Sequence, residues 1–172
     1  MTDGKGLTRE QIRKARGELG LIAAYGVLWR VPVKPTDPLN LRGVRRGQKS
    51  PVIDFKRQRG IYILYSSFGP RYVGKSWKND LGGRLESHLT DSHRGQWDRF
   101  SWFGFRRVID RGGKLVLADD EPETIPSIDP RGALRDLETV IIRGFGLHNV
   151  RPGHFNNADE WMQVDLSDVG VR

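Results

Sequence analysis

The chain has 172 residues, with 29 lysine and arginine residues against 21 aspartate and glutamate residues, a net charge of +8 and no cysteine. This composition excludes disulfides, a thiolate zinc site and a cysteine nucleophile, and no apolar run approaches the roughly 18 residues that span a bilayer. The pI near 10.1 is typical of proteins that bind nucleic acid. Because residues 1–7 lack the layout of a signal peptide, we expect a cytoplasmic protein with no membrane partner.

The N-terminal part of the chain predicts a helix followed by a basic arm. Apolar residues recur at helical spacing behind a capping box, so we expect a helix over about residues 8–25. Residues 31–52 contain several prolines and no sustained period, which indicates an extended connector. Basic residues crowd the end of this arm, and we expect Lys56, Arg57 and Arg59 to contact phosphates. The alternative is a solvated arm with no partner.

Two short motifs, Gly60-Ile61-Tyr62 and Tyr72-Val73-Gly74, lie on a predicted β-hairpin. The first strand is apolar at both parities, which indicates a strand covered on both faces. Turn residues separate it from the return strand at residues 71–75. A pairing symmetric about Ser67 would place the two tyrosines directly opposite each other, with both phenols on one face. Both side chains would then serve one site.

A helix is predicted over about residues 80–91, with Asp80 or Asn79 as its cap and a stripe of leucines as its buried face. Arg84 and His88 are four residues apart and therefore lie on one face. A guanidinium suits a phosphate oxygen, and an imidazole can act as a base near neutral pH. A surface arginine and a packed histidine are the alternatives for each residue taken alone.

The rest of the chain predicts a third strand at 100–108, a fourth short strand at 114–118 and a helix from Pro130 to about residue 145. Glu138 lies among apolar residues of this helix, so we expect it on the buried face. A buried carboxylate is costly unless it meets a cation or hydrogen-bond donors. Glu138 is therefore a candidate metal ligand, and a structural salt bridge to Arg84 or Arg135 is the alternative.

Taken together, these residues resemble the GIY-YIG endonuclease family over about residues 58–158. The two hairpin motifs match the two family signatures, with a valine in the middle of the second. The segment from Arg84 to His88 resembles the family helix, and Glu138 resembles its metal-binding glutamate. Asn156 or Asn157 resembles the asparagine that often closes the module.

The resemblance implies an α/β (α+β) fold, in which helices flank a small antiparallel sheet of three to four strands. An N-terminal helix and a basic extended arm would precede this module. The chain would then consist of an arm at residues 1–57, a nuclease domain at 58–158 and a tail at 159–172.

The resemblance also implies hydrolysis of DNA phosphodiester bonds with one Mg²⁺ or Mn²⁺ ion held by Glu138. Tyr62, assisted by His88, would take the proton from the attacking water, Tyr72 would position the water or the phosphate, and Arg84 would steady the phosphate. Further DNA contacts are expected from three residues outside the basic arm, which are Arg71, Lys75 and Asn156. Trp77, Trp97 and Trp102 are candidates for stacking on bases, although core packing is the favoured role of Trp102.

Several alternatives stay open on the sequence alone. The leading hypothesis is a metal-dependent DNA endonuclease, which could be a restriction-type enzyme, a defence effector or a stand-alone nuclease. Cleavage of both strands would need a homodimer or larger complex, or two successive nicks. The second hypothesis is a noncatalytic nucleic-acid-binding or regulatory module on the same fold. Short matches to other nuclease motifs, at Asp54-Phe55-Lys56 and around His148 and His154, lack the residues that would complete them.

Overall fold

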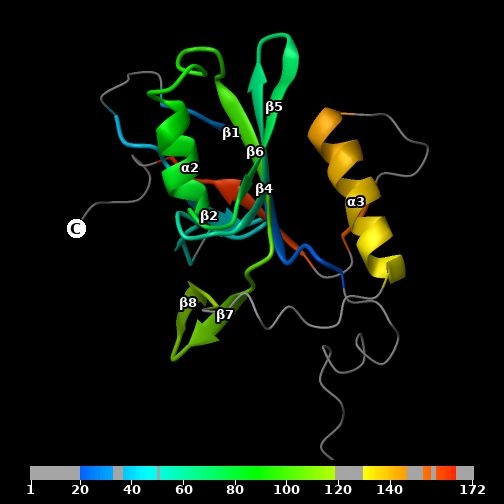
Figure 1. Cartoon of the computed structure of the whole chain (residues 1–172). Coiled ribbons are helices and arrows are strands. Elements are labelled where there is room, and N and C mark those ends of the chain that lie inside the picture. Colours follow the sequence, from blue (N-terminus) through cyan, green and yellow to red (C-terminus); the bar gives the residue numbers. More distant parts are fainter. Residues whose placement is uncertain are drawn as a thin grey trace, which may run out of the picture.

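The computed structural model describes residues 20–32, 37–49, 51–118, 130–146, 153–155 and 158–165. Its elements in chain order are β1 (Ala24–Arg30), β2 (Arg42–Arg45), β3 (Ile53–Asp54), β4 (Gly60–Ser66), β5 (Gly69–Ser76), α2 (Leu81–His88), β6 (Arg99–Gly104), β7 (Val108–Arg111), β8 (Lys114–Leu117), α3 (Pro130–Phe145) and β9 (Asp159–Gln163). Seven strands form one sheet in the order β3-β2-β9-β1-β6-β4-β5, and β7 and β8 form a separate ribbon (Figure 1).

The predicted sheet of three to four strands is wrong, because strands from both ends of the chain join the hairpin strands. β1 pairs antiparallel with β6 and parallel with β9, which makes the sheet mixed. β9 also pairs with β2, and β2 pairs with β3. One sheet thus combines strands from all three predicted segments of the chain. β2, β3 and β9 have only two to five residues each, which is too short for an alternating pattern to indicate a strand.

The predicted N-terminal helix is wrong at its C-terminal end. Residues 8–19 lie outside the described residues, but residues 24 and 25 begin β1. A Cβ at Gly26 would lie 2.5 Å from the indole nitrogens of Trp29 and Trp102. The packing of these two rings against β1 therefore needs the glycine at this position.

The two described helices cover opposite faces of the sheet (Figure 1). Successive residues of a strand point to opposite faces, and β4 follows this rule. Tyr62 and Leu64 pack in one core cluster with Leu81 and Leu85 of α2. Ile63 and Tyr65 pack in the other cluster, where α3 contributes Val140. The motif tyrosine of β4 therefore lies on the α2 face.

The hairpin β4–β5 is confirmed, but its predicted register is wrong. Tyr62 pairs with Gly74, and Tyr72 pairs with Leu64. The register shifts between Leu64 and Tyr65, and the partner of Tyr62 on β5 is two residues further along the chain than the symmetric pairing predicts. Both tyrosines still lie on one face of the sheet, and their ring centroids are 6.2 Å apart.

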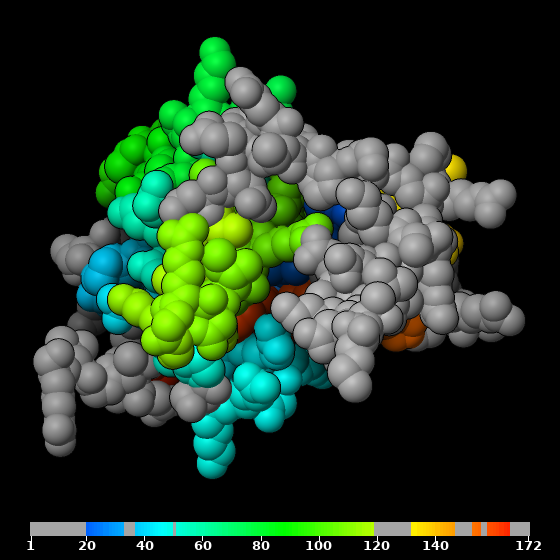
Figure 2. Space-filling model, turned by 90° about the horizontal axis from the view of Figure 1, so that it is seen from below, coloured from blue at the N-terminus to red at the C-terminus, as the bar shows by residue number. Residues whose placement is uncertain are grey.

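The strand predicted at 100–108 ends earlier, and the chain that follows forms the β7–β8 ribbon. Gly112 and Gly113 turn this ribbon with positive φ angles of 64° and 86°, as a two-residue hairpin loop requires. The ribbon lies beside β3, and a hollow between them is lined by residues of both, including Asp54 and Lys114. Figure 2 shows the lime-coloured ribbon next to the cyan segment on the face seen from below.

The helix predictions at 80–91 and from Pro130 are confirmed as α2 and α3. Neither of these helices has the length and apolar character needed to cross a membrane, and the same holds for every helix within the described ranges.

Candidate functional site

The site is centred on Tyr62, whose side chain is completely buried between β4 and α2. Its ring lies over Gly74, the residue opposite it on β5. A Cβ at position 74 would be 2.2 Å from the Tyr62 hydroxyl oxygen. The last glycine of the second motif thus leaves room for the tyrosine of the first, which is a physical reason for finding both residues in this chain.

Gly60 allows β4 and β6 to approach each other at the start of the first motif. Its φ is +155°, and a Cβ here would lie 2.0 Å from the carbonyl oxygen of Phe103 on β6. The backbone N–H of Gly60 donates to the hydroxyl of Ser76 at the end of β5 (3.0 Å). Three strands therefore meet at Gly60. This contact fixes the position of the β4 backbone that carries Tyr62 two residues later.

Helix α2 brings Arg84 and His88 to Tyr62. Asp80 caps the helix by accepting from the N–H of Gly83 (2.9 Å), as the sequence predicted. Leu85 is fully buried against the sheet, which orients the helix so that Arg84 and His88 face the same side as the tyrosines.

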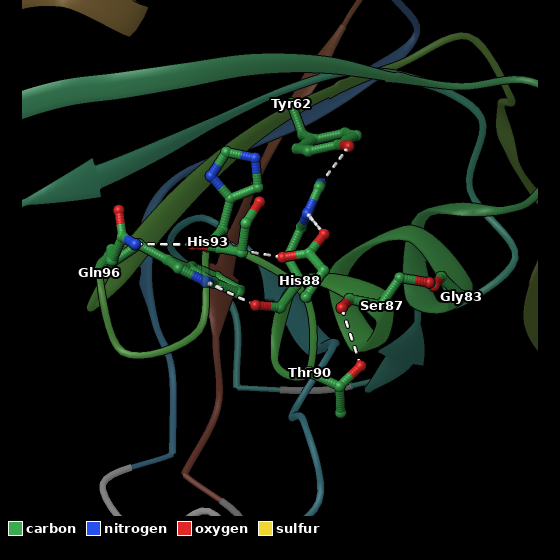
Figure 3. Close-up of polar contacts among 10 residues, drawn as sticks. Tyr62, Gly83, Ser87, His88, Thr90, His93 and Gln96 are labelled. Carbon is green, nitrogen blue, oxygen red and sulfur yellow. Dashed lines mark hydrogen bonds and ion pairs between the residues drawn. The ribbon is translucent and has the colours of Figure 1, made fainter.

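A chain of hydrogen bonds joins Tyr62, His88 and Asp91 (Figure 3). The Tyr62 hydroxyl is 2.8 Å from Nε2 of His88, and Nδ1 of His88 is 2.7 Å from the carboxylate of Asp91. An ionised carboxylate only accepts hydrogen bonds, so Nδ1 carries the proton and Nε2 accepts from Tyr62. The imidazole is therefore placed to receive the phenol proton.

The charge states of this chain follow from its surroundings. The backbone N–H of His93 donates to Asp91 and, with His88, lowers the pKa of that carboxylate. Burial lowers the pKa of His88, although the bond to Asp91 acts in the opposite direction. Burial also raises the pKa of Tyr62 to about 12. Near neutral pH, Tyr62 is therefore a neutral phenol, His88 a neutral imidazole and Asp91 a carboxylate.

Arg84 supplies a positive charge next to the phenols. It lowers the pKa of Tyr62 against the larger effect of burial, and Tyr62 and Tyr72 in turn raise the pKa of Arg84. Its Nε atom is buried and has no hydrogen-bond partner. Among the described residues, no carboxylate forms an ion pair with Arg84. Such an unpaired donor is suited to an anionic group that enters the site.

Tyr72 closes the outer side of the site. Its ring centroid is 5.1 Å from that of His88 and 4.6 Å from that of His93. The side chain is partly exposed on β5, in contrast to Tyr62. Tyr72 is thus the phenol that solvent and a substrate reach first, and Tyr62 is the phenol tied to the imidazole.

A positively charged hollow adjoins Arg84. It is lined by Gly60, Ile61, Lys75, Ser76, Trp77, Lys78, Asn79, Arg84 and Phe105. Among the described residues, the lining contains three cationic side chains and no carboxylate. Lys75, predicted to contact DNA, therefore lines the same hollow as Arg84, and so does Trp77, which is 40% exposed. The hollow suits a phosphate chain that leads toward Arg84.

The other predicted DNA contacts are dispersed. Lys56 forms an ion pair with Glu86 of α2 (2.9 Å), and Arg71 donates to the side chain of Gln96. Arg57 is exposed, whereas Arg59 is partly buried. Asn156 lies outside the described residues. Of the predicted tryptophans, Trp97 and Trp102 are buried in the core. The favoured core packing of Trp102 is therefore confirmed, stacking on a base is wrong for Trp97, and Trp77 remains available.

The predicted burial of Glu138 is wrong. The buried residues of α3 include Asp136, Thr139 and Val140, whereas Glu138 is exposed together with the apolar side chains that predicted the buried face. The cause is that Asp136 accepts a hydrogen bond from the N–H of Ile22 (2.7 Å), which turns a polar face of the helix inward. Glu138 makes no hydrogen bond or ion pair with any other described residue, and it lies on the sheet face opposite Tyr62.

Sequence reasoning missed Asp91 and His93, which the turn after α2 brings to the site. His88, Asp91 and His93 offer ligand atoms that all lie within 4.8 Å of one another. The spacing His-x-x-Asp-x-His was visible in the sequence, but the two residues lie beyond the helical pattern that drew attention to Arg84 and His88.

Comparison of this chain with protein-family models, with curated proteins and with solved structures gives no match. The resemblance to the GIY-YIG family therefore rests on the sequence motifs themselves. The description of the site rests on the contacts within this structure.

Proposed function

We propose that this chain is a nuclease that hydrolyses phosphodiester bonds of DNA, in the manner of the GIY-YIG enzymes that it resembles. The observation that carries the proposal is the 2.8 Å contact between the buried Tyr62 hydroxyl and Nε2 of His88. It links a phenol to a proton acceptor that is itself oriented by Asp91, beside an arginine without a carboxylate partner. This combination supports general-base chemistry on a substrate with a bound anion.

The proposed reaction moves two protons along the chain. Because Tyr62 is buried, the attacking water enters beside the partly exposed Tyr72. It attacks the phosphorus while its proton passes to the Tyr62 oxygen, and the Tyr62 proton passes to Nε2 of His88. The P–O bond to the leaving oxygen breaks, and that oxygen takes a proton from solvent. Asp91 stabilises the imidazolium, and Arg84 holds a phosphoryl oxygen through its unpaired Nε donor. Tyr72 positions the phosphate from the exposed side.

A divalent ion, Mg²⁺ or Mn²⁺, belongs to the family likeness, with Glu138 as the expected ligand. The exposed position of Glu138 on the other face of the sheet does not fit an ion that also reaches Tyr62. We therefore assign no step of the reaction to an ion at Glu138.

The second candidate is a noncatalytic nucleic-acid-binding or regulatory module. The separation of Glu138 from the phenols favours it, because the residue set that the resemblance implies is not gathered at one place. The hollow with Lys75, Lys78 and Arg84 would serve such a module equally well, since phosphate contacts alone give binding.

A restriction-type or defence role is part of the proposal, and so is a homodimer or larger complex. One site of this kind cuts one strand at a time. Cleavage of both strands would therefore require two copies or two successive nicks.

The test is cleavage of supercoiled plasmid, linear duplex, single-stranded DNA and RNA in Mg²⁺ or Mn²⁺, with Tyr62→Phe as the variant. The matched control is Tyr65→Phe, which removes a buried hydroxyl bonded to the carbonyl of Gly144 (2.7 Å) on the opposite face of the sheet. We expect Tyr62→Phe to lose at least 100-fold in rate and Tyr65→Phe to keep cleavage. Binding of DNA by the wild-type chain with no cleavage of any substrate would favour the noncatalytic module.

A further inference from the structure

The end of α2 and the turn that follows it gather a set of metal-ligating side chains. His88 is buried, His93 is partly buried and Asp91 is exposed. The two imidazole rings have centroids 4.9 Å apart and are nearly perpendicular. Figure 3 shows the ring of His93 beside His88 and below Tyr62.

We propose that His88, Asp91 and His93 form a site for one first-row transition-metal ion, of which Zn²⁺ is the best fit. Two imidazole nitrogens and one carboxylate oxygen are ligands that Zn²⁺ and its neighbours prefer, whereas Mg²⁺ prefers oxygen ligands and water. This site is therefore distinct in chemistry and in position from the Mg²⁺ or Mn²⁺ expected at Glu138.

The geometry needs only a small closure to hold an ion. Ligand atoms around a tetrahedral zinc are about 3.3 Å apart, because each Zn–N bond is about 2.0 Å. The three side chains already place their ligand atoms within 4.8 Å of one another. One carboxylate oxygen of Asp91 is held by the N–H of His93 (2.7 Å), so the other oxygen can turn to the metal while the residue stays anchored. The exposed side of Asp91 leaves the fourth position to water.

Metal binding would replace the proton that now lies between His88 and Asp91. In the metal-free chain Nδ1 of His88 carries that proton and donates to Asp91 (2.7 Å). With the metal on Nδ1, the ring keeps its neutral form only if the proton moves to Nε2. His88 would then donate to the Tyr62 oxygen and could no longer accept the Tyr62 proton.

The ion is therefore an inhibitor of the cleavage reaction, and this part of the inference rests on the proposed function. His88 has two exclusive states, one with Asp91 on Nδ1 that accepts a proton from Tyr62, and one with the metal on Nδ1 that does not. The metal site itself stands apart from that function and is measured without any substrate.

Binding is tested by titrating the untagged, EDTA-treated full chain with Co²⁺, followed by its visible absorption, and with Zn²⁺, followed by calorimetry. We expect one ion per chain, with at least tenfold weaker binding in His93→Asn and in Asp91→Asn. The control is His154→Asn, an exposed histidine outside the cluster, which should bind as the wild type does. Equal binding in wild type and both cluster variants, or no binding by the wild type, would overturn the site.

Inhibition is tested separately in cleavage assays with Mg²⁺ or Mn²⁺ and added Zn²⁺, with each variant compared with its own rate without zinc. Wild type and His154→Asn should lose at least tenfold, and His93→Asn should need at least tenfold more zinc for the same loss. Equal zinc sensitivity in His93→Asn would overturn the switch. A chain that binds Co²⁺ through His93 but cleaves nothing keeps the metal site and rejects the proposed function.

Discussion

Gly74 lies directly opposite Tyr62 across the β4–β5 pair, and a Cβ at that position would be 2.2 Å from the Tyr62 hydroxyl. The glycine thus controls the position of a hydroxyl that is bonded to His88 (2.8 Å). Gly74 contributes by leaving space, because any side chain larger than a hydrogen atom would displace the phenol of Tyr62.

Gly74→Ala should therefore displace the phenol and break its bond to His88. We expect a loss of at least tenfold in kcat with DNA binding retained, because Arg84 and the lysines of the hollow are untouched. Cleavage rates and binding by fluorescence anisotropy measure the two effects. Val73→Ala, at an exposed neighbouring position, is the control, and an equally active Gly74→Ala chain would contradict the packing argument.

Asp91 acts through His88 and is a positioning residue. Asp91→Ala removes the acceptor of the His88 Nδ1 proton, so we expect kcat to fall about tenfold or more while KM changes little. Asp91→Glu should recover part of the rate, which a loss of folding would not explain. The control is Asp98→Ala, an exposed carboxylate paired with Arg99. Equal losses of kcat in Asp91→Ala and Asp98→Ala would show that Asp91 does not position His88.

Arg84 should bind the phosphate through geometry as well as charge. Arg84→Lys keeps the charge but loses the buried Nε donor, so we expect a loss of at least tenfold in kcat/KM, and a larger one in Arg84→Ala. Arg94→Ala, on an exposed position of the following turn, serves as the control. Full activity of Arg84→Lys would show that the positive charge is sufficient and that the arrangement of the guanidinium donors has no role.

Glu138→Ala tests whether this residue binds the metal ion, as the family resemblance implies, or takes no part in cleavage, as its position in the structure indicates. The residue is exposed on α3 and on the face opposite Tyr62, so we expect the variant to keep its cleavage rate and its response to Mg²⁺ or Mn²⁺. The measurement is a metal titration of the rate in wild type and variant, with EDTA as the blank. Loss of cleavage with folding retained would show that Glu138 takes part in the reaction.

Asp136 predicts a pH dependence of stability that is independent of the site. Burial raises the pKa of this carboxyl above its ordinary value of 3.8, although the N–H groups of Ile22 and Leu21 and the charge of Arg135 lower it. A raised folded pKa means that its stabilisation is present below 3.8 and is lost as the pH rises through the folded pKa.

The free energy of unfolding of the wild type, minus that of Asp136→Asn, should therefore fall with rising pH over this window and then level off. Urea unfolding of both chains at a series of pH values from acid to neutral measures the difference. The amide keeps an acceptor for the N–H of Ile22 and has no titration of its own. A difference that stays constant or rises with pH would show that burial does not dominate.

The sequence predicted the hairpin, α2 and α3 because each has a strong local signal. Tight turn residues separate the two motif strands, and Asp80 lies directly before the leucine stripe that packs α2. The arrangement of β1, β2 and β9 depends on pairing between residues more than 100 positions apart, such as Tyr25 with Glu160. No local pattern carries that information.

For the site, the sequence predicted Tyr62, Tyr72, Arg84 and His88, and the fold brings these four together. It failed for the orientation of α3, because hydrophobicity alone favoured a face that Asp136 overrides through its bond to Ile22. Asp91 and His93 were not predicted, because they reach His88 through the turn after α2. The conformation of that turn does not follow from the spacing of these residues in the sequence.

The position of β9 between β1 and β2 also sets an order of assembly. Among the strands of the described residues, β4, β5 and β6 pair with one another or with β1 alone, so the part of the sheet that carries Tyr62 and Tyr72 can form while residues 159–163 are still being synthesised. Within the same residues, β2 and β3 join the sheet through β9 alone. A nascent chain would therefore acquire its phenols and imidazole before its far edge, and a chain shortened before residue 159 would lose that edge first.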